Sequence, residues 1–95
     1  MRVRFRLEAA SDVTAARDWY NERRAGLGDD LVAALENVLE LISEFPDAFP
    51  EIAGGLRRAM LRRFPYALYY RIDRDVVDVV AVLHNSRSPA SRQAR

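Results

Sequence analysis

A helical stripe of apolar residues between two helix-breaking signals most constrains the fold of this chain. The stripe recurs at helical spacing through residues 31–45, at Leu31, Leu35, Val38, Leu39, Ile42 and Phe45. This spacing places all six on one face of an amphipathic helix, which must pack on another apolar layer. Glycines at 26 and 28 precede the stripe and Pro46 ends it. We expect Asp29 or Asp30 to cap this helix.

A second helix is expected immediately before it, from about residue 9 to residue 25. Its apolar face carries Val13, Ala16 and Tyr20. The link between the two helices is only a few residues long, which favours an antiparallel hairpin.

Alternating residues predict strands on both sides of this hairpin. Residues 2–7 alternate strictly between apolar residues and arginines. Further strands are expected at 56–64, 66–72 and 76–84, with 73–75 as a tight turn and 47–55 as a loop. The order β-α-α-β-β-β predicts an α+β fold, with a helical hairpin packed on one face of a mainly antiparallel four-stranded sheet. We expect one domain over residues 1–88 and a flexible tail over 89–95.

The alternation also predicts which side chains face the helices. In the last strand one face is entirely apolar and is expected to pack on the helices: Val77, Val79, Ala81 and Leu83. His84 would then lie on the opposite, open side. By the same reasoning Tyr69 and Arg71 point outward. Residues 56–64 carry apolar residues and arginines on both faces, so the register of that strand stays open.

Composition excludes several chemistries. The chain has no cysteine and one histidine, so we expect neither a disulfide nor a metal, and no cofactor. All fifteen basic residues are arginine, so no lysine serves as base or nucleophile. Apolar stretches are too short to cross a bilayer, and the N-terminus lacks the apolar core of a secretory signal. We expect a soluble cytoplasmic protein that does not associate with membranes.

Charge is distributed unevenly although the formal net charge is only +1. Residues 8–51 hold eleven acids and three arginines, which gives −8, whereas residues 52–95 hold nine arginines and three acids, which gives +6. Residues 1–7 hold three arginines, which gives +3 and brings the sum of the three parts to +1. This asymmetry indicates anionic partners for the basic part.

Three segments resemble toxins of the RelE/ParE superfamily from type II toxin–antitoxin systems. They are residues 18–31 (DWYNERRAGLGDDL), 62–73 (RRFPYALYYRID) and 76–89 (VVDVVAVLHNSRSP). The resemblance covers nearly the whole chain and implies a small toxin neutralised by a cognate antitoxin that wraps its surface. It implies one of two mechanisms. RelE-like members are ribosome-dependent endonucleases that cut mRNA, and ParE-like members inhibit DNA gyrase. A non-toxic binding module of the same fold is the third alternative.

The candidate site residues follow from the chemistry of RNA cleavage, which needs a base, an acid and cations for the phosphorane. His84 and Arg87 are the catalytic candidates, since a histidine titrates near neutral pH. The anion- or target-binding candidates are Arg57, Arg58, Arg62, Arg63 and Arg71. Each also has a plain structural interpretation: a strand-end histidine bonded to backbone, and arginines that are solvated or bind the antitoxin.

Two departures from the RelE pattern favour the ParE-like mechanism. The lysines common on the RelE active face are absent, and no tyrosine follows Arg87. Base stacking by Trp19, Tyr20, Tyr66 and Tyr70 is a possibility, but core packing explains these aromatics better. Acids at 36, 40 and 44 recur every four residues, which is typical of a solvated helix face.

Overall fold

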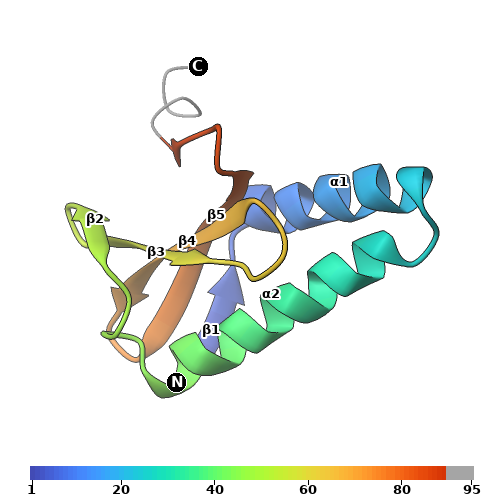
Figure 1. The fold of residues 1–95 in the computed structure, drawn as a ribbon. Helices are drawn as coiled ribbons and strands as arrows, with labels where there is room; N and C mark the ends of the chain where they lie inside the picture. The colour runs from blue at the N-terminus through green and yellow to red at the C-terminus, as the bar shows by residue number, and fades with distance from the viewer. Residues whose placement is uncertain (90–95) are drawn as a thin grey trace.

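The computed structural model describes residues 1–89, which form a five-stranded sheet and a helical hairpin (Figure 1). The elements are β1 (Arg2–Phe5), α1 (Leu7–Arg23), α2 (Leu27–Glu44), β2 (Glu51–Ala53), β3 (Leu56–Met60), β4 (Tyr66–Asp73) and β5 (Val76–His84). The sheet order is β1-β5-β4-β3-β2, with β1 parallel to β5 and the other pairs antiparallel. The α+β fold with a hairpin and a mainly antiparallel sheet is therefore confirmed. Of the tail predicted at 89–95, residues 90–95 lie outside the described residues.

The expected count of four strands is wrong, because β2 forms within the segment predicted as a loop. It is three residues long, each of them exposed, and it pairs with the start of β3 through Glu51↔Arg57 and Ala53↔Leu56. Three residues are too few for an alternating pattern to be recognised, which explains the omission.

The hairpin buries most of the predicted apolar faces against the sheet, but Phe45, predicted on the face of α2, is 56% exposed. On α2 these are Leu31, Leu35, Val38 and Ile42, and on α1 Ala16, with Val13 and Tyr20 partly buried beside it. The helices cross closely at Gly28, where an added Cβ would lie 2.1 Å from the Arg17 carbonyl oxygen. The predicted aspartate cap is wrong: Gly26, at φ +90°, occupies the N-cap, and Asp29 and Asp30 lie in the first turn.

A bulge in β5 changes which residues face the helices. Tyr69 pairs with Ala81 but Tyr70 pairs with Val79, so Val80 is an extra residue in the ladder. From Ala81 onward, each side chain lies on the opposite face of the sheet to the one that simple alternation predicts. Val82 joins the core under the helices, while Ala81 and Leu83 join a second apolar cluster on the open face. The prediction that Ala81 and Leu83 pack on the helices is wrong for this reason.

Strand β1 is fixed to β5 by a buried carboxylate on the open face. Asp78, 4% exposed, accepts hydrogen bonds from Arg6 Nε and Nη2 at 3.1 and 2.9 Å and from Arg4 Nε at 3.4 Å. Burial opposes its ionisation, but the hydrogen bonds from Arg6 and Arg4 outweigh burial and hold the pKa of Asp78 below its usual range. Two of the three N-terminal arginines are thus part of the sheet's structure.

Candidate functional site

The five arginines predicted to bind anions do not form one cluster. Arg57 lies on the helix side of β3, whereas Arg58 pairs with the outward-facing Tyr69 on the open side. Arg71 extends to the β2–β3 turn and donates a hydrogen bond to the carbonyl of Gly54. The remaining two, Arg62 and Arg63, follow β3 in the β3–β4 turn. The basic region of the sequence is thus split among three separate surfaces.

Arg57 stabilises the loop between α2 and β2 rather than serving as an open cation. Its Nη1 donates to the carbonyl oxygens of Phe49 and Asp47 at 2.7 and 3.1 Å. The buried Tyr70 hydroxyl donates to the Pro46 carbonyl oxygen at 2.6 Å, and burial raises the pKa of this phenol, so it remains a donor. Together these bonds hold the Phe49 ring against the core.

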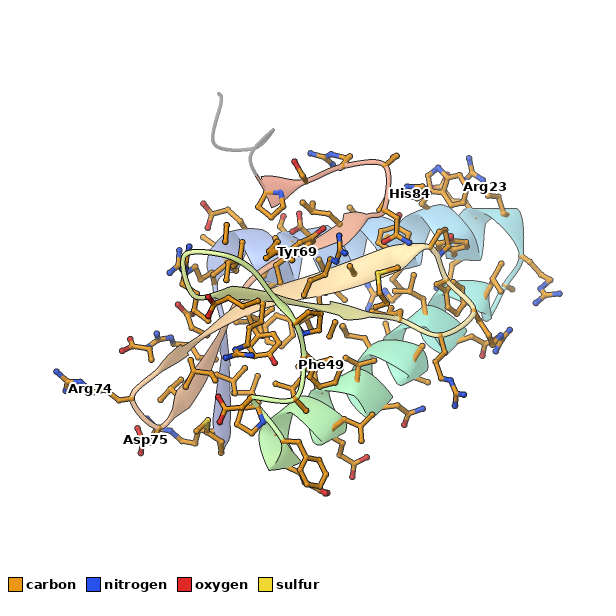
Figure 2. All side chains as sticks on the ribbon, turned by 60° about the vertical axis from the view of Figure 1, so that its left-hand side comes forward. Arg23, Phe49, Tyr69, Arg74, Asp75 and His84 are labelled. Atoms are coloured by element: carbon orange, nitrogen blue, oxygen red, sulfur yellow. The ribbon has the colours of Figure 1, made fainter. Side chains whose placement is uncertain are left out.

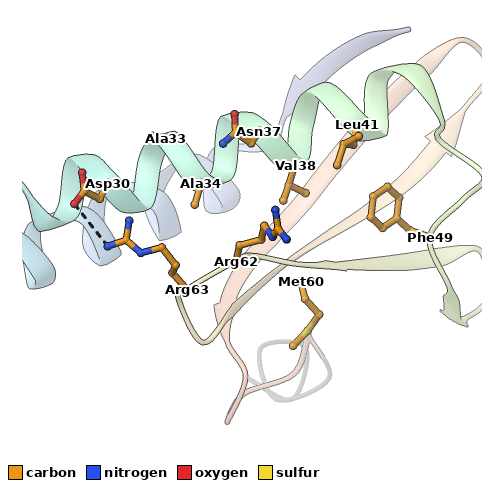
Figure 3. A pocket seen from close by; sticks show the side chains of 10 residues that line it. All are labelled: Asp30, Ala33, Ala34, Asn37, Val38, Leu41, Phe49, Met60, Arg62 and Arg63. Carbon is orange, nitrogen blue, oxygen red and sulfur yellow. Dashed lines mark ion pairs between the residues drawn. The ribbon is translucent and has the colours of Figure 1, made fainter.

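A groove lies between α2 and the β3–β4 turn (Figure 3). Its volume is about 670 Å³. Along α2 its wall consists mainly of small and apolar side chains, Ala33, Ala34, Asn37, Val38 and Leu41, and Phe49 and Met60 lie opposite. Leu41 and Met60 are each about half exposed, at 51% and 52%. The groove therefore presents apolar surface that no part of residues 1–89 covers.

The groove also contains an unpaired strand edge. Strand β2 accompanies β3 only as far as Arg58, whose N–H donates to the Pro50 carbonyl. The Leu61 N–H donates to the Tyr66 carbonyl on β4, and backbone direction alternates along a strand, so the N–H and C=O of Met60 point away from β4. Such a segment can accept an added strand.

Arginines mark one end of the groove. Arg63 has φ +70°, a left-handed conformation that costs about 1 kcal/mol for a residue with a side chain. In this conformation its guanidinium lies 4.0 Å from the Asp30 carboxylate on α2. Arg62 is exposed and makes no ion pair within residues 1–89. The groove thus combines an apolar floor with an unpaired cation.

His84, one of the two catalytic candidates, lies on the other side of the sheet from the predicted one, and Arg87 follows it in the same turn. The β5 bulge turns His84 to the helix side, where its ring meets Tyr66 edge-on at 5.4 Å. The prediction of an open-face position is wrong. Ser86 N–H donates to His84 Nδ1 at 3.0 Å, and the Arg87 N–H donates to the His84 carbonyl at 2.8 Å. This turn fixes the imidazole and leaves Nε2 as its outward nitrogen.

A second hollow, the cleft, opens beside His84. It has a volume of about 390 Å³ and is lined by Asp12, Ala15, Ala16, Trp19, Tyr20, Tyr66 and His84, from α1, β4 and β5. The Asp12 carboxylate accepts the Val82 N–H at 3.0 Å and so joins α1 to β5. Burial and the neighbouring Tyr20 raise the pKa of Tyr66, and the positive charge of Arg87 lowers it in part. Arg87 is not among the residues that line the cleft, but it lies in the turn that follows His84, to whose carbonyl its N–H donates.

Core packing explains Tyr70 and, in part, Tyr20 and Tyr66, but the prediction is wrong for Trp19. The indole is 48% exposed, and the Arg23 guanidinium carbon lies 3.2 Å from its ring centre. Figure 2 shows Arg23 and His84 at the same end of the molecule, far from Arg74 and Asp75. The helical spacing of Trp19 from the core residue Ala16 could have indicated this, since three residues place a side chain about 60° off a buried face.

Neither a metal site nor a membrane span is found in the described part of the chain. No three histidine, cysteine or acidic side chains among residues 1–89 are grouped to hold an ion. The acids at 36, 40 and 44 are exposed, as expected for a solvated face. Neither α1 nor α2 is long and apolar enough to cross a bilayer.

Two solved structures share this architecture. One match, at TM-score 0.66 and 18% identity, belongs to the chromosomal ParDE toxin–antitoxin system from P. aeruginosa and covers 88% of this chain and 95% of the other. The isolated E. coli RelE toxin also matches at TM-score 0.66, with 22% identity over 98% of this chain and 93% of the other. At these identities the likeness establishes the fold alone. No curated protein gives a significant match.

The family is established by sequence. Residues 3–89 match the model of the ParE toxin of type II toxin–antitoxin system, parDE. The chain therefore belongs to the ParE toxin family, and the predicted RelE/ParE resemblance is confirmed.

Proposed function

We propose that this protein is a ParE-like toxin that arrests growth by binding DNA gyrase and does not cleave RNA, and that a cognate antitoxin neutralises it. The observation that carries this proposal is the separation of the candidate catalytic groups. His84 lies on the helix side of the sheet, whereas Arg58 and Arg71 lie on the opposite face. Both candidate targets, gyrase and the ribosome, are cytoplasmic, so the toxin would act there.

RNA cleavage through a 2′-hydroxyl requires a base, an acid and cations within reach of one phosphate. In this protein His84 Nδ1 is occupied by the Ser86 N–H, which leaves one nitrogen for chemistry. Arg87 is the one predicted arginine that accompanies it. A single imidazole and one guanidinium supply an incomplete set, which supports inhibition by binding.

The groove supports the antitoxin part of the proposal. Its apolar floor, its strand edge at Met60 and its unpaired Arg62 suit a partner segment with apolar side chains and an acidic residue. Strand addition would satisfy the outward backbone groups of β3, and a carboxylate would lie against Arg62 and Arg63. We therefore place the antitoxin along α2 and β3.

Induced expression tests the function directly. The toxin is expressed with and without the neighbouring antitoxin gene, in wild-type form and as His84→Ala. We expect arrest in both forms, relief by the antitoxin, loss of negative supercoiling and intact transcripts. The RelE-like alternative rests on the proximity of His84 and Arg87 and predicts cleaved transcripts that disappear in His84→Ala. Absence of arrest from well-folded wild-type protein would instead indicate a non-toxic binding module.

A further inference from the structure

We propose that the cleft between α1 and β5 is a nucleotide-binding site, which holds a planar base against Trp19 and its phosphate near Arg87. This inference does not depend on the gyrase proposal. The nucleotide can be free or an unpaired position in a nucleic-acid strand, because both present the same ring and the same anion.

The first argument is the open face of the Trp19 indole. Side chains on a helix lean toward its N-terminus and meet neighbours four residues away. On one side, Arg23 stacks on the ring at 3.2 Å and also donates to the Trp19 carbonyl at 2.8 Å. Ala15, four residues earlier on α1, lines the cleft together with Trp19, and its methyl group occupies little of that space. A ligand ring in this space would complete a stack of guanidinium, indole and base.

The second argument is the linked set of rings around the cleft. Trp19 and Tyr20 meet edge-on at 4.9 Å, Tyr20 and Tyr66 at 6.1 Å, and Tyr66 and His84 at 5.4 Å. Each ring is fixed by its neighbour, so the walls of the cleft are formed before a ligand arrives. Preformed walls reduce the entropy lost on binding.

The third argument is the polar chemistry at the cleft. A base offers donors and acceptors at its edge, and the cleft offers the Nε2 of His84, whose Nδ1 already accepts from the Ser86 N–H. Arg87 lies in the turn after His84, to whose carbonyl its N–H donates at 2.8 Å, and would supply a cation for the phosphate. A volume of about 390 Å³ suits one nucleotide base and is small for a peptide segment.

The sole tryptophan of the chain provides the measurement, because a stacked nucleobase quenches indole emission. Purified toxin is titrated with AMP, GMP and short single-stranded oligonucleotides up to about 10 mM nucleotide, the range of weak single-ring sites. We expect saturable quenching. Ala15→Leu fills the space beside Trp19 at an exposed position and should weaken binding about tenfold or more. Ala10→Leu, the same change elsewhere on α1, is the matched control and should leave it unchanged.

The titrations with mononucleotides and with oligonucleotides distinguish a free nucleotide from a nucleic-acid strand as the ligand. Quenching by mononucleotides that Ala15→Leu abolishes supports a free nucleotide as ligand. Quenching by oligonucleotides alone, abolished by the same variant, supports a strand. Absence of quenching in all titrations overturns the proposal, as does quenching that Ala15→Leu leaves intact. Ribose 5-phosphate has the sugar and the phosphate but no base. If it displaced a bound nucleotide as well as another nucleotide does, the proposal would also be overturned, because the site would then recognise only an anion.

Discussion

The groove is lined by α2 and the cleft by α1, and the two have different chemistry. The groove runs along α2 beside a sheet edge, has an apolar floor and is nearly twice as large as the cleft. The cleft is walled by rings from α1, β4 and β5 that fix one another. One surface suits a length of partner chain, and the other suits a single planar group. Basic residues border both, so charge alone does not distinguish them.

Because the two surfaces differ, binding of the antitoxin in the groove can be distinguished from binding of another ligand in the cleft. A partner in the groove would contact β3 and α2 and leave Trp19 exposed. A ligand in the cleft would contact α1 and leave the edge of Met60 open. The two surfaces share only the hairpin that carries their walls, so substitutions can address them one at a time.

The largest effect is expected from Gly28→Ala, which disturbs the hairpin and therefore both surfaces. The new Cβ would meet the Arg17 carbonyl oxygen at 2.1 Å, so the helices must move apart. We expect a loss of about 3 kcal/mol in the free energy of unfolding, measured by urea denaturation. The control Gly54→Ala meets no atom within 4 Å and should cost only about 1 kcal/mol, for its φ of +50°. Equal losses would contradict the close helix crossing.

The double variant Arg62→Glu with Arg63→Glu addresses the groove alone. Reversal of both charges should weaken antitoxin binding about 10- to 100-fold and reduce its salt dependence, as measured by titration calorimetry. Arg2→Glu with Arg74→Glu makes the same charge change at exposed positions outside the groove. If this control lost as much affinity as the groove variant, net charge and not the groove would attract the antitoxin.

Asp78→Asn addresses neither surface and tests the anchor of β1. Because the folded pKa of Asp78 is lowered, its contribution is present above the ordinary aspartate value and is lost as pH falls through the folded value. We expect a loss of about 1–2 kcal/mol at neutral pH, since both arginines are partly exposed. The difference from wild type should shrink below about pH 4. A difference independent of pH would rule out the carboxylate as its source.

The smallest effect is expected from Tyr70→Phe, which removes the bond to Pro46 and loosens the loop that carries Phe49. We expect about 1 kcal/mol lower stability. Antitoxin binding should weaken slightly, and Trp19 emission should remain as in wild type. A shift in that emission would mean that the groove and the cleft are coupled through the core.

Sequence patterns were sufficient for the helices and for most of the sheet. The α2 stripe is unambiguous because apolar residues recur over four turns and Pro46 ends them. The face of His84 was not predictable, since residues 76–83 are apolar on both faces except at Asp78. A one-residue bulge at Val80 therefore leaves the hydrophobic pattern intact while it inverts every later side chain.

The candidate sites were predicted less completely than the fold. The arginine pairs at 57–58 and 62–63 look alike in sequence, yet Arg57 fixes a loop, Arg58 faces outward and the second pair lies at the groove. Their separation depends on β3 ending at Met60, a boundary that the mixed pattern of 56–64 does not reveal. Proximity of Trp19 to His84 depends on contact between α1 and β5, which no local pattern encodes.

Backbone hydrogen exchange of the toxin, with and without bound antitoxin, tests most directly the claim that the antitoxin occupies the groove. The amide of Met60 points away from β4, so it should exchange rapidly in the isolated toxin. We predict that the antitoxin slows exchange at residues 58–63 while Trp19 emission stays constant. Unchanged exchange at Met60 together with a shift in Trp19 emission would contradict the account, because the antitoxin would then occupy the cleft.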